Sequence, residues 1–428
     1  MRSNRPTRRQ LLALAPAPLF VPSRVLGAYA PSKRVSVGVI GVGRQTVTVN
    51  LKQFFAMPEV QIAALCDTDS WRLESALALV EKATGQKGCK SYRNYQELLA
   101  DKSIDAVLVA TPDHWHVPMS IAAVKAGKDV CCEKPLTRTI GEGRALAAMV
   151  KKHKRVFRTD SEYRSKPWYH QAREAVRNGR IGVLTAIHTG VPKGDIGCPP
   201  QPEMPVPPEL DYEMWQGPAP RAPYTEKRVH KPHSYERPGW MRRLEYCDGM
   251  ITNWGTHHND LAQSANGTDR TGPVEVEGKG TYPDRDSFWN VLLDFEVQYR
   301  YANGVRLTYK IDKPSIRFEG TEGWIYADDT GKIEASAASI LRPPSGSDWI
   351  RLPVKTDKQD FIDAVRTRGE TMADAEVGHR TTSLCHLGHI AIQVGQRLEW
   401  DPQRERFKNN EAANRFLDRP MQPVRLSD

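Results

Sequence analysis

The chain has 428 residues, of which 39% are hydrophobic and 26% are charged. These fractions exclude a disordered or fibrous protein, and the length predicts roughly two to three folded domains. The formal net charge of +10 does not indicate nucleic-acid binding, because half of it lies in residues 1–30, which hold five arginines and no acidic residue. We therefore expect a globular protein with no nucleic-acid partner.

The first 30 residues have the pattern of an export signal. Arg8 and Arg9 precede an apolar run at 11–21, and the Ala-Tyr-Ala sequence at 28–30 matches a small-x-small cleavage site. The run is about half of the ~20 residues that span a bilayer, and it contains two prolines, so a membrane anchor is disfavoured. We predict a twin-arginine signal peptide over 1–30, an exported or periplasmic mature protein, and no integral membrane segment.

The next part of the chain, up to residue 158, alternates short apolar runs with helical stretches, a pattern typical of a parallel sheet with crossover helices. The runs predict strands at Val35–Ile40, Val60–Cys66, Ala106–Ala110, Asp129–Cys132 and Arg155–Arg158. The stretches between them predict helices at Ser70–Thr84, Tyr95–Ala100, Val117–Ala126 and Gly141–His153. Nearly continuous apolar character indicates strands buried on both faces. Three of the seven cysteines lie in these strands and are expected as free buried thiols, and no disulfide pairing can be assigned from the sequence.

From residue 159 to 428 the pattern changes to longer alternating strands and proline-rich loops. Val291–Tyr301 and Val305–Ile311 alternate around an Asn-Gly turn and predict a hairpin, and Ser315–Glu319 and Gly323–Ala327 predict a second strand pair. We expect an α+β domain with a large, mostly antiparallel sheet that is covered on one face. Exposed apolar sheet surface is usually covered, so we also expect a homodimer or homotetramer. Residues 199–238, rich in Pro, Arg and His, are interpreted as a long arm.

A Gly-x-Gly turn, Gly41 to Gly43, directly follows the first predicted strand. Such a turn lets a pyrophosphate approach backbone amides at the start of a helix, where partial positive charge favours it. Thr46 replaces the third glycine of the usual pattern. Asp67 ends the second strand, 24 residues after Gly43, where an acid accepts hydrogen bonds from ribose hydroxyls. That acid favours NAD(H) over NADP(H), although the nearby arginines at 44 and 72 weaken the preference. Residues 31–158 are thus expected to form a Rossmann dinucleotide-binding domain.

Two further strand ends carry polar residues. Thr111-Pro112, with His114 and His116 close behind, follows the third predicted strand, and Glu133-Lys134-Pro135 follows the fourth. Both lie at the carboxyl edge of the predicted sheet, where nucleotides bind. A lysine at this edge can direct its ammonium group to the nicotinamide. For the two histidines, hydrogen bonding to loop backbone is an equally good interpretation.

These motifs, with a later His-rich helix, resemble in order and spacing the Gfo/Idh/MocA oxidoreductase family, of the glucose-fructose oxidoreductase and inositol dehydrogenase type, in an exported branch. The resemblance covers residues 34 to about 425. It implies that Lys134 is catalytic, beside the substrate hydroxyl. It also implies that the cofactor is bound by Gly41, Gly43, Arg44, Gln45, Asp67, Thr111, Pro112, His116, Glu133 and Lys134.

The family's substrate motif is Asp-x-x-x-His-x-x-Asp, and this chain has Asn253-x-x-x-His257-x-x-Asp260. The spacing places the three side chains on one helical face. The resemblance implies that His257 is the acid/base residue that takes the hydroxyl proton. Asn253 departs from the motif, because an amide can donate and accept hydrogen bonds but cannot ionise. Tyr163 and Arg164 follow the last strand of the first domain and should face the cleft, so the expected substrate contacts are Tyr163, Arg164, Asn253, His257, His258 and Asp260.

Other interpretations of these residues remain open. A metal site at His257 and His258 is disfavoured, because adjacent helical side chains point about 100° apart; we predict no metal. The histidines could instead pack structurally at the domain junction. The basic, aromatic stretch at 221–243 fits either a pocket for an anionic sugar or an arm that packs on a neighbouring subunit.

The first functional hypothesis is an NAD(P)-dependent oxidoreductase that transfers hydride between a sugar or cyclitol hydroxyl and a tightly bound nicotinamide. The second is an NAD-dependent glycosidase or lyase that acts through transient sugar oxidation. The third is a non-catalytic sugar-binding protein with a degenerate site, which the replacement at Asn253 keeps open.

Overall fold

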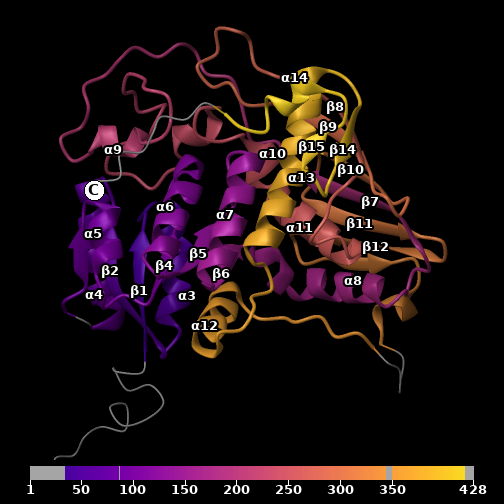
Figure 1. Cartoon of the computed structure of the whole chain (residues 1–428), viewed down its shortest axis with the longest axis horizontal. Coiled ribbons are helices and arrows are strands. Elements are labelled where there is room, and N and C mark those ends of the chain that lie inside the picture. Colours follow the sequence, from indigo (N-terminus) through magenta and orange to yellow (C-terminus); the bar gives the residue numbers. More distant parts are fainter. Residues whose placement is uncertain (1–33, 86, 344–348, 420–428) are drawn as a thin grey trace, which may run out of the picture.

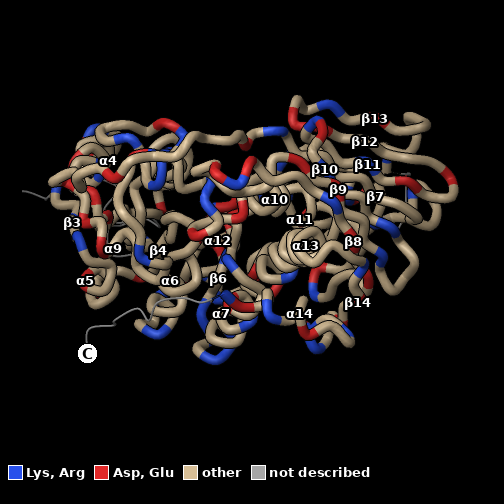
Figure 2. The backbone as a smooth tube through the Cα atoms, turned by 90° about the horizontal axis from the view of Figure 1, so that it is seen from above, with Lys and Arg blue, Asp and Glu red and all other residues tan. Residues whose placement is uncertain are grey.

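The computed structural model describes residues 34–85, 87–343 and 349–419, so the predicted signal peptide lies outside the described residues. Two domains lie side by side, the first in indigo and purple and the second mainly in orange and yellow (Figure 1). Basic and acidic residues are interspersed over both domains (Figure 2). In these ranges no helix has the length and apolar character needed to cross a membrane.

The first domain is a six-stranded parallel sheet with the order β3-β2-β1-β4-β5-β6. Its strands are β1 (Val35–Ile40), β2 (Val60–Cys66), β3 (Lys90–Tyr92), β4 (Ala106–Val109), β5 (Asp129–Glu133) and β6 (Phe157–Asp160). Its helices are a π-helical turn (Thr46–Asn50) continued by α3 (Leu51–Phe55), then α4 (Ser70–Thr84), α5 (Tyr95–Ala100), α6 (Asp113–Lys125) and α7 (Ile140–His153). The strand order reverses between β1 and β4, which is where doubly wound sheets bind their ligands. The predicted Rossmann fold is confirmed.

Two boundaries in this domain differ from the prediction. Helix α6 begins at Asp113 instead of Val117, so the histidines at 114 and 116 lie in its first turn and not in a loop. Pro112 precedes the helix in an extended conformation, and the apolar pattern alone does not reveal these first polar residues. Strand β6 ends at Asp160, two residues beyond the expected domain boundary. All seven cysteines are unpaired, and Cys66, Cys131 and Cys132 are buried as free thiols.

The second domain is built on a nine-stranded sheet with the order β13-β12-β11-β7-β10-β9-β8-β14-β15. Strands β7 and β10 pair in parallel, and the other pairs are antiparallel. The strands are β7 (Leu184–Val191), β8 (Glu275–Thr281), β9 (Asp294–Arg300), β10 (Arg306–Ile311), β11 (Ser315–Gly320), β12 (Gly323–Asp328), β13 (Ile333–Ala335), β14 (Leu398–Asp401) and β15 (Arg406–Phe407). Both predicted strand pairs are present as hairpins, and the predicted α+β class of the domain is confirmed.

One face of this sheet packs against helices α8 (Pro167–Arg177), α11 (Gly255–Asn266) and α13 (Ala375–Val394). In β11, for example, Ile316 and Phe318 are buried against them. The alternate residues Arg317 and Glu319 point to the other face, where their side chains pair at 2.8 Å. The outward row of β11 is therefore charged, and the expected homodimer or homotetramer stays a prediction.

The expected arm is present between β7 and α10 (Met250–Asn253), and its regular structure is limited to α9 (Tyr212–Gln216) and short turns such as the 3₁₀ turn Gly239–Arg242. It arches over the top of the first domain in Figure 1. A small core of its own includes Trp215 and Tyr246. The arm meets the first domain through a backbone bridge between Asp69 and Leu210 and a hydrogen bond from the Ser70 amide to the Glu209 carbonyl. It therefore covers the nucleotide-binding domain of its own chain.

Late in the sequence the chain returns to the first domain. Helix α12 (Asp357–Thr367) packs Phe361 into the apolar core formed by β1, β2 and β4. Arg158 of β6 is fully buried and pairs with Asp357 at 2.7 Å and Asp360 at 3.0 Å. A division of the chain at residue 158 does not capture this return, because α12 belongs structurally to the sheet that it covers. The last short helix is α14 (Glu411–Asn414).

The buried Arg158 cluster predicts unequal effects for two acids of α12. Asp360→Asn should lower the free energy of unfolding by about 3 kcal/mol, because the buried guanidinium loses a charged partner. Asp363→Asn on the same helix removes a partly exposed pair with Lys355 and should cost less than about 1 kcal/mol. Urea denaturation followed by circular dichroism measures both, and equal midpoints for the two variants would contradict the assignment.

Candidate active site

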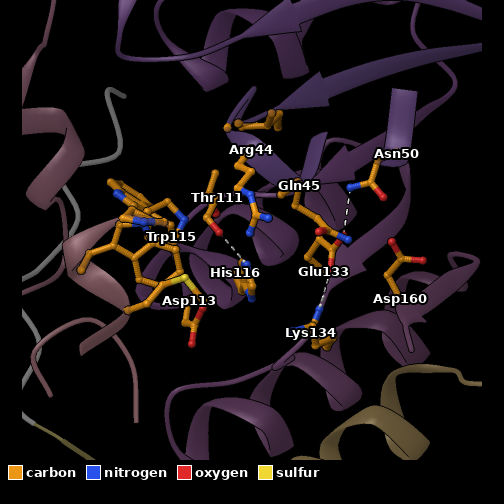
Figure 3. Close-up of a pocket in the computed structure, with 18 of the residues that line it drawn as sticks. Arg44, Gln45, Asn50, Thr111, Asp113, Trp115, His116, Glu133, Lys134 and Asp160 are labelled. Carbon is orange, nitrogen blue, oxygen red and sulfur yellow. Dashed lines mark hydrogen bonds between the residues drawn. The ribbon is translucent and has the colours of Figure 1, made fainter. Parts of the chain in front are cut away.

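A cavity of about 450 Å³ lies at the carboxyl edge of the first sheet, between that sheet, the arm and the α10–α11 segment. Figure 3 shows residues of its wall. Most of the predicted site residues line it: Gly41, Gly43, Arg44, Gln45, Asp67, Thr111, Pro112, His116, Glu133, Lys134, Tyr163, Asn253 and His257. The predicted catalytic pair, Lys134 and His257, thus faces one cavity although the two residues come from different domains.

The glycine turn is open toward this cavity. Gly41 has φ +91°, and a Cβ atom there would lie 2.6 Å from the Ala110 carbonyl oxygen, so only glycine fits. At Gly43 a Cβ would meet nothing closer than the Arg72 guanidinium at 3.6 Å, which leaves a cradle beside the cavity. The Thr46 hydroxyl donates to the Gly41 carbonyl at 2.7 Å, so the residue that replaces the third glycine turns inward and braces the turn.

Asp67, the residue predicted to bind the ribose, lines the cavity. Its carboxylate accepts hydrogen bonds from the backbone amides of Val42 at 2.8 Å and Asp69 at 2.9 Å. Burial raises the pKa of this carboxyl. Arg72, which could have favoured a 2′-phosphate, instead donates to the Ser234 carbonyl at 2.8 Å and lies 3.3 Å from the His230 ring nitrogen. Its charge is therefore already engaged by the arm.

Glu133 and Lys134 occupy the other end of the cavity (Figure 3). Glu133 accepts from the Asn50 side-chain amide at 2.9 Å, and burial, with the neighbouring Asp160, raises its pKa to about 7. The Lys134 ammonium donates to the Asn253 backbone carbonyl at 2.9 Å and to its side-chain oxygen at 3.2 Å. Both oxygens of Asn253 that face Lys134 are uncharged, so the amide orients the lysine without neutralising it.

His257 is buried, and its Nδ1 atom has no hydrogen-bond partner among the described residues. Burial and the nearby ammonium of Lys134 hold the pKa of the imidazole well below its usual range, so the ring is neutral at pH 7. The Tyr163 ring stacks on it at 4.3 Å between centroids. The Tyr163 hydroxyl donates to Asp329 at 2.5 Å, which fixes the stack from the second sheet. A neutral, fixed imidazole can accept a proton.

Three predicted substrate residues lie outside the cavity wall. Arg164 and Asp260 form a buried bidentate ion pair, with nitrogen–oxygen distances of 2.6 and 2.7 Å. His258 has no exposed surface and lies 3.4 Å from the Tyr169 hydroxyl, and burial lowers its pKa to about 4. We correct the expected substrate contacts accordingly: these residues fix α11 against its neighbours. Helical spacing placed Asp260 near His257 but could not reveal a distant arginine partner.

His116 lines the cavity, but both of its ring nitrogens contact backbone carbonyl oxygens. Its ring nitrogens lie 2.7 Å from the Pro135 carbonyl oxygen and 2.9 Å from the Thr111 carbonyl oxygen. Burial lowers its pKa to about 4, so the neutral ring can donate to only one of them. It thereby ties together the loops that follow β4 and β5. His114 likewise contacts the Trp215 carbonyl of the arm, at 3.0 Å.

The basic stretch at 221–243 does not form a free anion pocket. Arg237 and Arg242 pair with the buried Asp195, at 3.0 and 3.7 Å, and Arg243 pairs with Glu245. Arg228 reaches the same Glu245 at 3.4 Å. These ion pairs hold the arm together, as the interpretation of the stretch as an arm expects.

The sequence analysis missed several residues of this cavity. Asn50 lies in the helical segment that follows the glycine turn, and its contact with Glu133 could not be seen without the fold. Lys358 of α12 is buried and donates to Asp160, whose other carboxylate oxygen lacks a partner among the described residues. His230 reaches Asp69 from the arm at 2.9 Å. Of the missed residues, only Asp113 could have been found locally, because it directly follows the Thr111-Pro112 motif at a predicted strand end.

The residues present fit a dinucleotide. The cradle at Gly43 is open, the strand-end acid Asp67 faces the cavity, and the buried Thr111 hydroxyl lacks a partner among the described residues. Arg44 also borders the cavity and can meet a pyrophosphate (Figure 3). A parallel sheet with such a turn at its switch point, followed by an α+β domain that completes the cavity, defines a two-domain dinucleotide-binding protein.

Comparison with known families places the chain within this class. Residues 35–161 match the model described as oxidoreductase family, NAD-binding Rossmann fold, and residues 195–425 match the oxidoreductase family, C-terminal alpha/beta domain. The chain belongs to the Gfo/Idh/MocA oxidoreductase family, as its motifs had indicated.

Curated relatives match only part of the chain. A glycosyl hydrolase family 109 protein of Shewanella sp. (strain ANA-3) and an α-N-acetylgalactosaminidase of Shewanella oneidensis are each 35% identical over 134 residues. That span is 30% of this chain and 29% of each relative, so the chain covers less than a third of their length.

Solved structures share the fold over most of the chain. The aldose-aldose oxidoreductase of Caulobacter crescentus, complexed with glycerol, has a TM-score of 0.63 at 18% identity. The WlbA dehydrogenase of Bordetella pertussis, in complex with NADH and UDP-GlcNAcA, has the same score and identity. Each comparison covers 86% of this chain and 99% of the other. At this identity the likeness establishes the fold alone.

The two glycines predict separable defects. Gly43→Ala should fold with an unchanged melting temperature but lose at least about tenfold in dinucleotide affinity, because the methyl group fills the cradle. Gly41→Ala should lower the melting temperature, because it forces a strained backbone and a clash with Ala110. Thermal denaturation and dinucleotide titration measure the two effects. Full dinucleotide affinity in a folded Gly43→Ala protein would show that nothing approaches this turn.

Proposed function

We propose that the protein transfers hydride between a secondary hydroxyl of a sugar or cyclitol and a bound nicotinamide. The observation that carries the proposal is the meeting of the Lys134 ammonium and the neutral His257 imidazole in one cavity that also contains an open glycine turn. A hydroxyl placed between these groups has a hydrogen-bond donor on one side and a proton acceptor on the other. Members of this fold that bind nucleotide sugars or sugar-like ligands, such as the WlbA dehydrogenase, support a carbohydrate substrate.

The proposed roles of His257 and Lys134 follow from their charges, because the imidazole is neutral and the lysine is an ammonium ion. His257 accepts the hydroxyl proton, because its ring is neutral and its Nδ1 atom has no hydrogen-bond partner among the described residues. Lys134 donates a hydrogen bond to the oxygen as negative charge develops on it. Asn253 keeps the ammonium in place through its two oxygens. The nicotinamide, when bound, supplies the hydride acceptor.

For the cofactor we propose NAD(H) in preference to NADP(H). Asp67 would place negative charge beside a 2′-phosphate, and it accepts two backbone hydrogen bonds that hold it there. Arg72 is engaged by Ser234 and His230, so it is not available to compensate. This engagement supports the proposed preference for NAD(H).

We further propose that the cofactor is retained between turnovers. The arm borders the cavity with Trp215, His230 and Trp240 and is fastened to the ribose edge where His230 meets Asp69. A dinucleotide beneath it could leave only after these contacts open. Retention would suit a protein exported with its cofactor already bound, as proposed for the segment at 1–30.

Cofactor identity and retention can be tested together. Protein folded in the cytoplasm and then denatured should release about one NAD(H), and no NADP(H), per chain. Before denaturation, exchange with labelled NAD should be slow, and His230→Ala should speed it at least about tenfold because the arm loses its anchor. Arg221→Ala, which removes an exposed pair elsewhere on the arm, is the control. Material that folds with an empty cavity, or that releases NADP(H), would refute this part of the proposal.

A second candidate is an NAD-dependent glycosidase that oxidises its sugar only transiently. The names of the curated relatives, glycosyl hydrolase family 109 protein and α-N-acetylgalactosaminidase, favour it. It uses the same oxidation step, so the cavity described above serves both candidates. The two differ in whether reduced cofactor remains after each turnover.

Lys134→Ala should reduce turnover by at least ~10²-fold while the bound cofactor is kept, since the lysine acts on the substrate oxygen. Net reduction of the cofactor by free sugars would identify the dehydrogenase. Release of the aglycone from nitrophenyl glycosides without accumulated reduced cofactor would identify the glycosidase. If the native protein showed neither reaction and the lysine variant behaved in the same way, both candidates would fail and the non-catalytic alternative would stand. Absorbance at about 340 nm reports the reduced cofactor, and absorbance at about 405 nm reports released nitrophenol, so the two reactions can be measured separately.

A further inference from the structure

Asp113 is a buried acid that the proposed chemistry does not use. It is the first residue of the 13-residue helix α6, directly after Pro112, and it lines the cavity although only 3% of its surface is exposed. Figure 3 draws it near Trp115, on the side of the cavity away from Arg44. The helix dipole stabilises an acid at the start of a helix, so it explains why an acidic residue is accepted at position 113. It does not explain why this acid is buried beside a cavity.

No other described residue forms a hydrogen bond with the Asp113 carboxyl. The charged groups nearest to it are Arg138, Lys134, Asp248 and the thiol of Cys247. Arg138 pairs with Asp248 at 3.1 Å and donates to the Leu244 carbonyl, and Lys134 is held by Asn253. Because Asp113 lines the cavity, a ligand bound there can reach its carboxyl.

The protonation state of Asp113 limits what that ligand can be. Burial raises its pKa to about 8, so the carboxyl is mainly protonated at pH 7. A protonated carboxyl offers one donor and one acceptor, which complements a hydroxyl group. A ligand carboxylate at the same place would instead bury a second acid beside Asp113. Arg237, which also lines the cavity, already pairs with Asp195.

We propose that Asp113 binds a ring hydroxyl of the substrate and selects uncharged sugars over sugar acids. This inference rests on the proposed function, because it assigns the substrate class of the same cavity. Asp113 is a specificity-determining residue and takes no part in the transfer of the hydride. It favours a neutral sugar over the anionic sugar that the basic stretch at 221–243 left open.

The test uses the full-length, cofactor-loaded protein and matched sugar pairs: galactose with galacturonate, glucose with glucuronate, and N-acetylgalactosamine. Binding is followed by quenching of tryptophan fluorescence, since Trp115, Trp240 and Trp254 line the cavity. We expect at least one neutral sugar to bind ~10-fold or more tightly than its acid at pH 7. Asp113→Ala should weaken that sugar ~10-fold and reduce the preference, whereas Asp113→Asn, which keeps one donor and one acceptor, should restore much of the binding.

The pH dependence provides a readout that a purely structural role would not move. As the pH rises through about 8, Asp113 ionises and loses its donor, so binding of the neutral sugar should weaken in the native protein and stay level in Asp113→Asn. Glu97→Gln, an exposed acid in the first turn of the neighbouring helix α5, is the control and should change neither affinity nor pH profile.

The possible results distinguish the two proposals. Selective binding of a neutral sugar without hydride transfer or glycoside cleavage would remove the proposed function and leave the role of Asp113 intact. Turnover with equal use of neutral and acidic sugars, or unchanged selectivity in Asp113→Ala, would overturn the role of Asp113 alone. Binding of sugar acids only, or of none of these sugars, would also overturn it.

Discussion

The contact between Lys134 and Asn253 is the interaction on which the site depends, because it joins the two domains at the point of chemistry. The lysine follows β5 of the nucleotide-binding domain, and the asparagine ends the short helix α10 of the second domain. Its backbone carbonyl supplies the closer oxygen, at 2.9 Å, so part of the contact is independent of the side chain. This is why an uncharged residue can occupy the place of the family's acid without separating the lysine from His257.

Buried charge in this region is balanced mostly by residues far away in the sequence. Glu133 and Asp160 end adjacent strands, and like charges at such close range disfavour each other's ionised form. Lys358 approaches them from α12 and is itself fully enclosed. Arg158 is neutralised by the same helix. Helix α12 therefore does more than cover a sheet: it sets the electrostatic environment of the nicotinamide end of the cavity.

The sequence predicted features that repeat locally. Alternating or continuous apolar runs gave the strands, and the rule that ligands bind at the carboxyl edge of a parallel sheet brought Asp67, Glu133 and Lys134 together. Partners that depend on long-range packing were not predictable. Arg164 was assigned to the substrate because the residues near it in the sequence do not show that it pairs with Asp260, which is 96 residues away. The return of α12 and the anchor at His230 were missed for the same reason.

The arm shows how composition can mislead when partners are unknown. Its arginines suggest an anion site, yet each acid that satisfies them lies within the arm or at its base, as Asp195 and Glu245 do. What the arm presents to the cavity is instead largely aromatic, through Trp215 and Trp240, with His230 at the ribose edge. Such side chains would contact a bound ring without adding charge. The basic residues therefore stabilise the arm, whereas the aromatic residues line the cavity.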